Sequence, residues 1–186
     1  MSKLPEKHQF LDLSDYGRSL GHFIATKLQN TSLTPIHVTT MFLITGFIAI
    51  GLLLKGYLIA SAFLLLLKSI LDAADGELAR LKKKPSYVGR YYDSISDLIL
   101  NFCFLLSLWY ITDISIIYMI IAFLAIQLQG TLYNYYYVIL RNSVKGDSTS
   151  RIFENTTPKA LNGESQLAVN IFYNIYCLLY IPFDKT

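Results

Sequence analysis

Residues 72–97 read DAADGELARLKKKPSYVGRYYDSISD, and this stretch decides the fold. It ends one apolar run with Asp72 and Asp75 and opens the next with Asp93 and Asp97. Residues 72, 75, 76, 79 and 80 are spaced i, i+3, i+4, i+7 and i+8, which places them on one helical face. Residues 89, 93 and 97 are four apart and share a face of the second run. The stretch therefore predicts two helices whose acidic faces meet at the edge of a membrane.

Four carboxylates that converge at a membrane need positive charge between them. Burying one carboxylate in a membrane segment costs about 2.5–3.5 kcal/mol, and four together also repel one another. Magnesium prefers oxygen ligands, and two Mg²⁺ ions would neutralise four aspartates while leaving positions open for phosphate oxygens. We therefore predict a site for two Mg²⁺ ions, with Mn²⁺ as the alternative ion. The competing interpretation is four unrelated aspartates at solvated helix ends.

The composition is that of a membrane protein. Of the 186 residues, 53% are hydrophobic and only 16% are charged, against about 25% charged in soluble proteins. The hydrophobic residues fall in long runs, which predicts an all-α, polytopic membrane helical bundle. Membrane helices are expected at residues 38–54, 57–81, 91–111 and 114–140. Residues 10–28 predict an N-terminal interfacial amphipathic helix, and residues 167–183 predict either another interfacial helix, which is favoured, or a short fifth span.

The charge pattern predicts how the chain sits in the membrane. The chain is predicted to divide into an interfacial and cytoplasmic segment, residues 1–33, and a membrane domain, residues 34–186. Basic residues gather in the first segment and around residues 80–90, whereas the loop at residues 112–115 has none. Cytoplasmic loops carry an excess of lysine and arginine, so the N-terminus and the aspartates are expected on the cytoplasmic side, at the inner membrane if the source is bacterial.

Two classes of partner and site are excluded. No basic stripe with interleaved aromatic residues is present, so nucleic acid is not an expected partner. Cys103 and Cys177 both lie in apolar runs, which favours small buried side chains over a disulfide or a zinc site.

The acidic stretch resembles the signature of the CDP-alcohol phosphotransferase family, class I, D-x2-D-G-x2-A-R-x8-G-x3-D-x3-D. Every fixed position of that signature matches, across 26 residues of the chain. The resemblance implies a transferase that moves a phosphoalcohol group, such as a phosphatidyl group, from a CDP-linked donor to an acceptor alcohol, with release of CMP. Such an enzyme serves phospholipid biosynthesis and depends on Mg²⁺.

The resemblance also implies roles for individual residues. The implied metal ligands are Asp72, Asp75, Asp93 and Asp97. Asp97 is in addition the implied general base. Residues 34–39 read TPIHVT and are similar to the family's T-P-N-x-x-T, with Ile36 in place of asparagine. The implied substrate-binding residues are Thr39, Gly76, Ala79, Arg80, Ser86 and Gly89.

The partners that follow from the resemblance are a CDP-linked lipid or alcohol donor, an alcohol acceptor, membrane lipids and a second copy of the chain in a homodimer. The family usually has six membrane helices, so one or two C-terminal helices are expected to be missing from this chain. Two other functions stay open. One is an ion or proton transporter with an intramembrane acidic site, and the other is an inactive structural relative.

Five further residues receive an interpretation from the pattern alone. Lys68 lies one turn before Asp72 and either pairs with that aspartate or a phosphate, or reaches along the bundle to water. Glu77 lies off the acidic face and is not an expected ligand, and His22 is expected at the surface. The spacing of Gly17 and Gly21 carries little weight, because it lies outside an apolar helix.

Overall fold

The computed structural model describes residues 16–144 and 155–184, and those residues form helices and no strands. The helices are α1 (Arg18–Leu28), α2 (Pro35–Leu54), α3 (Leu58–Leu81), α4 (Tyr87–Ile111), α5 (Ile116–Ser143) and α6 (Gln166–Asp184). The predicted all-α bundle is confirmed, and the predicted helix ends lie close to the observed ones. The part of the N-terminal helix that was predicted before residue 16 lies outside the described residues.

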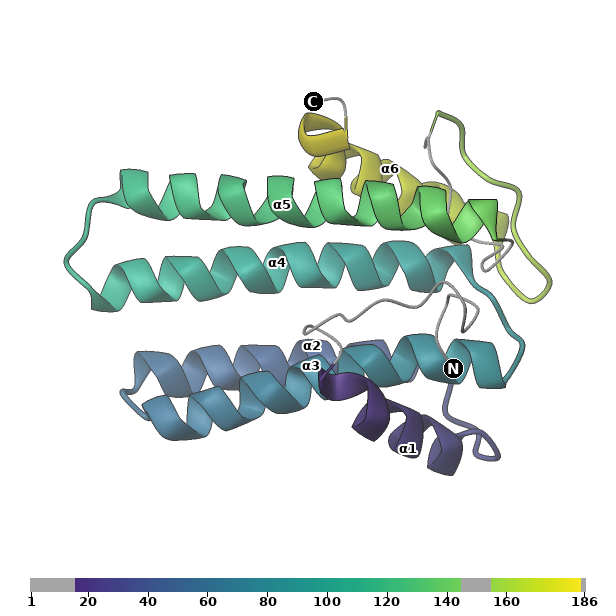
Figure 1. Ribbon diagram of the computed structural model, residues 1–186, viewed down its shortest axis with the longest axis horizontal. Helices are drawn as coiled ribbons and strands as arrows, with labels where there is room; N and C mark the ends of the chain where they lie inside the picture. Colours follow the sequence, from purple (N-terminus) through teal and green to yellow (C-terminus); the bar gives the residue numbers. More distant parts are fainter. Residues whose placement is uncertain (1–15, 145–154, 185–186) are drawn as a thin grey trace.

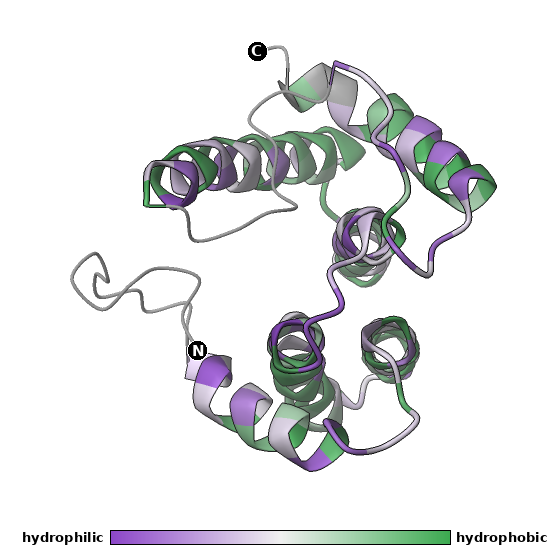
Figure 2. Cartoon of the chain, turned by 90° about the vertical axis from the view of Figure 1, so that its right-hand side faces the viewer, coloured by the Kyte–Doolittle hydropathy of each residue, from purple (hydrophilic) through white to green (hydrophobic). Residues whose placement is uncertain are grey.

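The helices stack in layers around α4. Helices α2 and α3 run side by side, and α4 packs against α2 on one side and against α5 and α6 on the other (Figure 1). Figure 2 looks along the bundle and shows α4 at its centre. Helices α3 and α4 are not a closely packed pair among the described helices, so side chains rather than backbones meet between them.

Three helices, α2, α4 and α5, are long and apolar enough to cross a membrane. Large apolar side chains on α5 stay exposed, such as Ile117 at 61% and Leu132 at 58%, which suits contact with lipid. The chain is therefore an integral membrane protein. Helix α3 has the length of a span but carries Lys68, Asp72 and Asp75, and it packs against α1 and α2. For α6, the interfacial placement stays a prediction.

Side-chain caps explain why two helices begin earlier than their apolar runs. Thr34 caps α2 by accepting the His37 N–H, and the His37 ring accepts the Thr34 N–H in return at 2.9 Å. Helix α4 begins at Tyr87, one turn before the predicted start at residue 91. There the Ser86 hydroxyl accepts the Gly89 N–H at 2.8 Å. This cap adds one helical turn at the N-terminal end of α4, before Asp93 and Asp97.

The turn between α3 and α4 ends α3 with paired backbone hydrogen bonds. Lys83 adopts φ 51°, a left-handed conformation that is uncommon for lysine. The Lys84 N–H donates to the Ala79 carbonyl and the Lys83 N–H donates to the Arg80 carbonyl, both at 3.1 Å. Pro85 follows and cannot continue the helix. The chain therefore reverses within a few residues, and both acidic segments lie near the same end of the bundle.

Helix α1 lies against α3 through two glycines. A Cβ at Gly21 would lie 3.0 Å from the Ala73 Cβ, and one at Gly17 would lie 3.4 Å from the Ser69 carbonyl. Small residues at this spacing allow two helix backbones to approach closely, so the Gly17–Gly21 spacing has a structural role. The large side chains of α1 are left outside, with Phe23 60% exposed, as expected for an interfacial helix.

Candidate metal centre

Three of the four aspartates converge between α3 and α4. Asp72 and Asp75 lie one turn apart on α3, and Asp93 lies in the second turn of α4. Each offers a carboxylate oxygen, and these three oxygens all lie within 4.8 Å of one another. We call these residues the three-aspartate group. The sequence predicted that four aspartates converge; the structure brings Asp72, Asp75 and Asp93 together and leaves Asp97 outside the group.

Asp75 is the most deeply buried member of the three-aspartate group, with 6% of its surface exposed. The Thr39 hydroxyl of α2 donates to Asp75 Oδ2 at 2.5 Å and lies 3.1 Å from the Pro35 carbonyl. Thr39 is itself 2% exposed. It therefore supports the Asp75 carboxylate from the α2 side. A hydrogen bond of this kind fixes the orientation of a metal-binding carboxylate.

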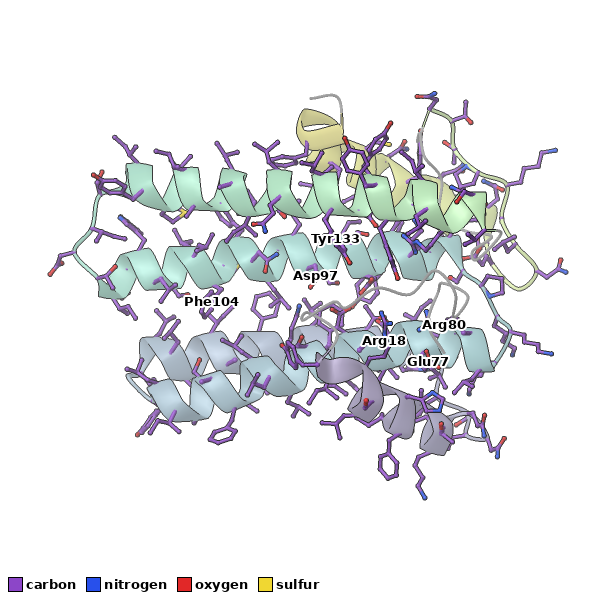
Figure 3. The ribbon with its side chains drawn as sticks, viewed as in Figure 1. Arg18, Glu77, Arg80, Asp97, Phe104 and Tyr133 are labelled. Atoms are coloured by element: carbon purple, nitrogen blue, oxygen red, sulfur yellow. The ribbon has the colours of Figure 1, made fainter. Side chains whose placement is uncertain are left out.

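Asp97 lies outside the three-aspartate group and contacts a lysine side chain. Its Oδ1 forms an ion pair with Nζ of Lys68 on α3, and the two side chains are 35% and 16% exposed. The Lys68 ammonium also lies 4.9 Å from the centre of the Phe42 ring. The sequence offered Asp72 or a phosphate as the partner of Lys68, and the structure gives Asp97. Figure 3 shows Asp97 further from the α3–α4 turn than Arg80.

The donor set of the three-aspartate group fits a hard divalent cation. All three donors are carboxylate oxygens, the ligand type that Mg²⁺ and Mn²⁺ prefer over nitrogen or sulfur. Oxygens bound to one Mg²⁺ lie about 3–4 Å apart, because each Mg–O bond is about 2.1 Å long. The observed spacing is only slightly wider. Three carboxylates on two helices that are not closely packed can therefore hold a metal ion between them.

Arg80 is held in place by Glu77, a residue that the sequence analysis set aside. Glu77 is 1% exposed and accepts hydrogen bonds from Arg80 Nε at 3.1 Å and Nη2 at 2.5 Å. His22 Nδ1 of α1 lies 2.8 Å from the other Glu77 oxygen. The acidic face of α3 gave no sign of Glu77, because its carboxylate faces α1. The i, i+3 spacing from Glu77 to Arg80 was the available signal.

Gly76 and Ala79 lie on the same helix as Asp72 and Asp75, between Asp75 and Arg80. Gly76 has open space above it, because an added Cβ would meet only the flexible end of Arg80, at 3.6 Å from Nη1. No packing inside the described part of the chain therefore requires a glycine at this position. Ala79 is half-buried. The α3 surface beside Arg80 is thus lined by small residues, which leaves the backbone open to a ligand.

Ser86 and Gly89 lie at the start of α4, where their contacts are structural. The Ser86 hydroxyl donates to Glu164 Oε1 at 2.7 Å, and the Val88 N–H donates to the same oxygen at 2.8 Å. A Cβ at Gly89 would lie 3.1 Å from the Ser86 hydroxyl oxygen. Glu164 stands just before α6 and had no role in the sequence analysis, because no local pattern links it to residue 86.

The comparisons with known proteins agree with this geometry. The family model for CDP-alcohol phosphatidyltransferase matches residues 33–160, about two thirds of the chain. The matched region contains the three-aspartate group, Asp97, Arg80 and Thr39. No curated protein and no solved structure matches the chain. Because the family model covers more than half of its length, the chain belongs to the CDP-alcohol phosphatidyltransferase family.

Proposed function

We propose that this protein transfers a phosphoalcohol group from a CDP-alcohol to the hydroxyl of an acceptor alcohol, releases CMP, and depends on Mg²⁺. Membership of the family supports a role in phosphatidyl transfer for lipid synthesis. The observation that carries the more specific reaction is the three-aspartate group, whose oxygens lie within 4.8 Å of one another inside the matched region. The donor, the acceptor, membrane lipids and a second copy of the chain in a homodimer are the proposed partners.

Asp72, Asp75 and Asp93 would hold the divalent cations. When bound, these ions neutralise the charge of the pyrophosphate and stabilise the charge that develops during transfer. Thr39 keeps Asp75 in orientation through its short hydrogen bond. Asp72 and Asp75 come from α3 and Asp93 comes from α4. Ions held by all three carboxylates, with the donor bound to them, would therefore link the two helices.

Asp97 is the proposed general base. It lies one turn beyond Asp93 on α4, so an acceptor hydroxyl could reach both the donor phosphate and this carboxylate. Asp97 takes the hydroxyl proton while the hydroxyl oxygen attacks the β-phosphorus of the donor. The bond from that phosphorus to the CMP oxygen breaks, and CMP leaves with the electron pair. Positioned proton transfer of this kind contributes about 10²–10⁴-fold to a rate.

Arg80 and the open surface at Gly76 are proposed to bind the donor. The Arg80 guanidinium is fixed by Glu77 with two hydrogen bonds, and a fixed guanidinium suits phosphate oxygens. Ala79, Ser86, Gly89 and Thr39 remain proposed binding residues by resemblance. For Ser86 and Thr39, the hydrogen bonds described above support an indirect role, through the α4 cap and through Asp75.

Replacing Glu77 with glutamine is expected to raise the KM for the donor about 10-fold while kcat changes little. The neutral amide keeps the shape of Glu77 but loses the charge that orients Arg80, so donor binding weakens and the chemistry does not. Steady-state kinetics with varied donor measure this split. Asp113→Asn, in the exposed turn after α4, makes the same carboxylate-to-amide change away from Arg80 and is the control. An unchanged KM in Glu77→Gln would show that Glu77 does not position Arg80 for donor binding.

The active site is proposed to face the cytoplasm, with the N-terminus on the same side. A cysteine at exposed Lys84 is expected to react with a membrane-impermeant maleimide only from the cytoplasmic side, and one at exposed Asp113 only from the other side. Cys103 and Cys177 are replaced by alanine beforehand, so that each variant carries one thiol. Labelling of the two sites in the opposite pattern would reverse the orientation.

Release of CMP tests the proposed reaction directly. The purified full chain in lipid nanodiscs is incubated with radiolabelled CDP-diacylglycerol, CDP-choline or CDP-ethanolamine and a panel of acceptor alcohols. CMP is expected from one donor only when its acceptor is present, and EDTA is expected to stop its release until Mg²⁺ is restored. Absence of CMP with every combination would favour an inactive relative. Proton or cation flux without CMP release would favour the transporter.

A further inference from the structure

Lys68 is a charged residue inside the bundle that the family signature does not include. It lies on α3 one turn before Asp72 and on the same face as the α3 aspartates, and its side chain is 16% exposed. A lysine at this depth is costly unless it is paired. Its position therefore needs an explanation beyond the match to the family.

Three helices fix the position of the Lys68 ammonium. The stem comes from α3, the Asp97 carboxylate comes from α4, and the Phe42 ring of α2 lies 4.9 Å from Nζ. Phe42 is fully buried, so the ring cannot move aside easily. A cation over an aromatic ring and beside a carboxylate is held by both at once. Lys68 is thus placed to control where the Asp97 carboxylate lies.

The contact with Lys68 also divides the four aspartates. Asp72, Asp75 and Asp93 share one group, whereas Asp97 contacts the ammonium through Oδ1. A carboxylate that binds a metal ion through both oxygens is a weaker proton acceptor, because the ion stabilises its ionised form. A contact through one oxygen leaves Oδ2 available, and the described residues provide no hydrogen bond to that atom.

We propose that Lys68 is a positioning residue that holds Asp97 apart from the three-aspartate group, so that Asp97 accepts the proton of the acceptor instead of binding metal. This inference rests on the proposed function and assigns to Lys68 the separation of two roles among four similar carboxylates. Without the ammonium, Asp97 is one turn from Asp93 and free to join the metal-binding oxygens.

A double-mutant cycle on metal binding tests this separation without relying on activity. Wild type, Lys68→Met, Asp97→Asn and the double variant are titrated with Mn²⁺, and the free ion is followed by its EPR signal. In the wild-type background, Asp97→Asn is expected to change the Mn²⁺ affinity by less than about 3-fold. In the Lys68→Met background, the same change is expected to weaken binding at least about 10-fold, because Asp97 has become a ligand.

Kinetics supply a second readout that a purely structural lysine would not move. Lys68→Met is expected to lower kcat about 10²-fold, the lower range for loss of a general base, with the donor KM nearly unchanged. Lys68→Arg keeps the charge and is expected to restore most of kcat and the wild-type affinity for Mn²⁺. Lys55→Met makes the same change just after the C-terminal end of α2. This variant is the matched control and is expected to behave as wild type.

Equal effects of Asp97→Asn in the two backgrounds would overturn the inference, as would wild-type kcat in Lys68→Met. These outcomes differ from failure of the proposed function. If wild type binds Mn²⁺ and releases CMP but the cycle shows no coupling, only the role of Lys68 is wrong. If wild type binds no Mn²⁺ and releases no CMP, both the function and the inference are wrong.

Discussion

Replacing Asp72 with asparagine is expected to abolish turnover, with a loss of at least about 10³-fold, and to remove divalent-cation binding. The amide keeps the shape of the side chain but removes an anionic oxygen from a group whose three donor oxygens lie within 4.8 Å. Asp72 is the best position for this test. Asp75 is buried and bonded to Thr39, so its replacement would also disturb the packing of α2 on α3.

The measurements for Asp72→Asn are Mn²⁺ titration and CMP release on the same purified sample. Asp113→Asn, in the exposed turn after α4, makes the same chemical change far from the group and serves as the control. The variant is expected to insert in the membrane and to keep its helix content, because Asp72 is only half-buried. Metal binding equal to that of wild type would exclude Asp72 as a ligand.

The second large effect separates Asp93 from Asp97. Asp97→Asn is expected to bind donor and metal as wild type does and to lose about 10²–10⁴-fold in turnover, the usual contribution of a general base. Asp93→Asn is expected to weaken the binding of both metal and donor, because Asp93 belongs to the three-aspartate group and Asp97 contacts Lys68 instead. Calorimetry of donor binding beside single-turnover rates measures the two effects separately.

An equal loss of donor affinity in the two variants would show that Asp97 is a metal ligand. The acceptor proton would then leave to water or to a phosphate oxygen, and Lys68 would not separate Asp97 from the metal ligands. Lys68→Arg keeps a positive charge beside Asp97, so this variant is expected to retain most of the wild-type turnover.

Local patterns in the sequence predicted the helices and most of the acidic site. Long apolar runs located α2 to α5, and three of these helices, α2, α4 and α5, are long and apolar enough to cross a membrane. The spacing of the aspartates predicted a shared face on each helix, and the structure joins those faces between α3 and α4. Both predictions depend only on helical periodicity, which residues close in the chain determine.

The parts that the sequence did not predict depend on how helices are placed against one another. Lys68 pairs with Asp97, 29 residues away, because of the offset between α3 and α4, which the spacing within α3 does not reveal. Glu77 was set aside because it lies off the acidic face, yet that position directs it to His22 of α1. Gly17 and Gly21 gained a role only when α3 was found against them.

The contact of Glu164 with the first turn of α4 bears on where an independently folding unit of this protein can end. The family match stops at residue 160, and a chain cut there would lose the carboxylate that accepts from Ser86 and from the Val88 N–H. The same carboxylate also binds the Leu161 N–H through its other oxygen, at 3.2 Å. A shortened protein would therefore fray at the turn that precedes Asp93. A shortened form of this protein is therefore better ended after Glu164 than at residue 160, where the family match stops.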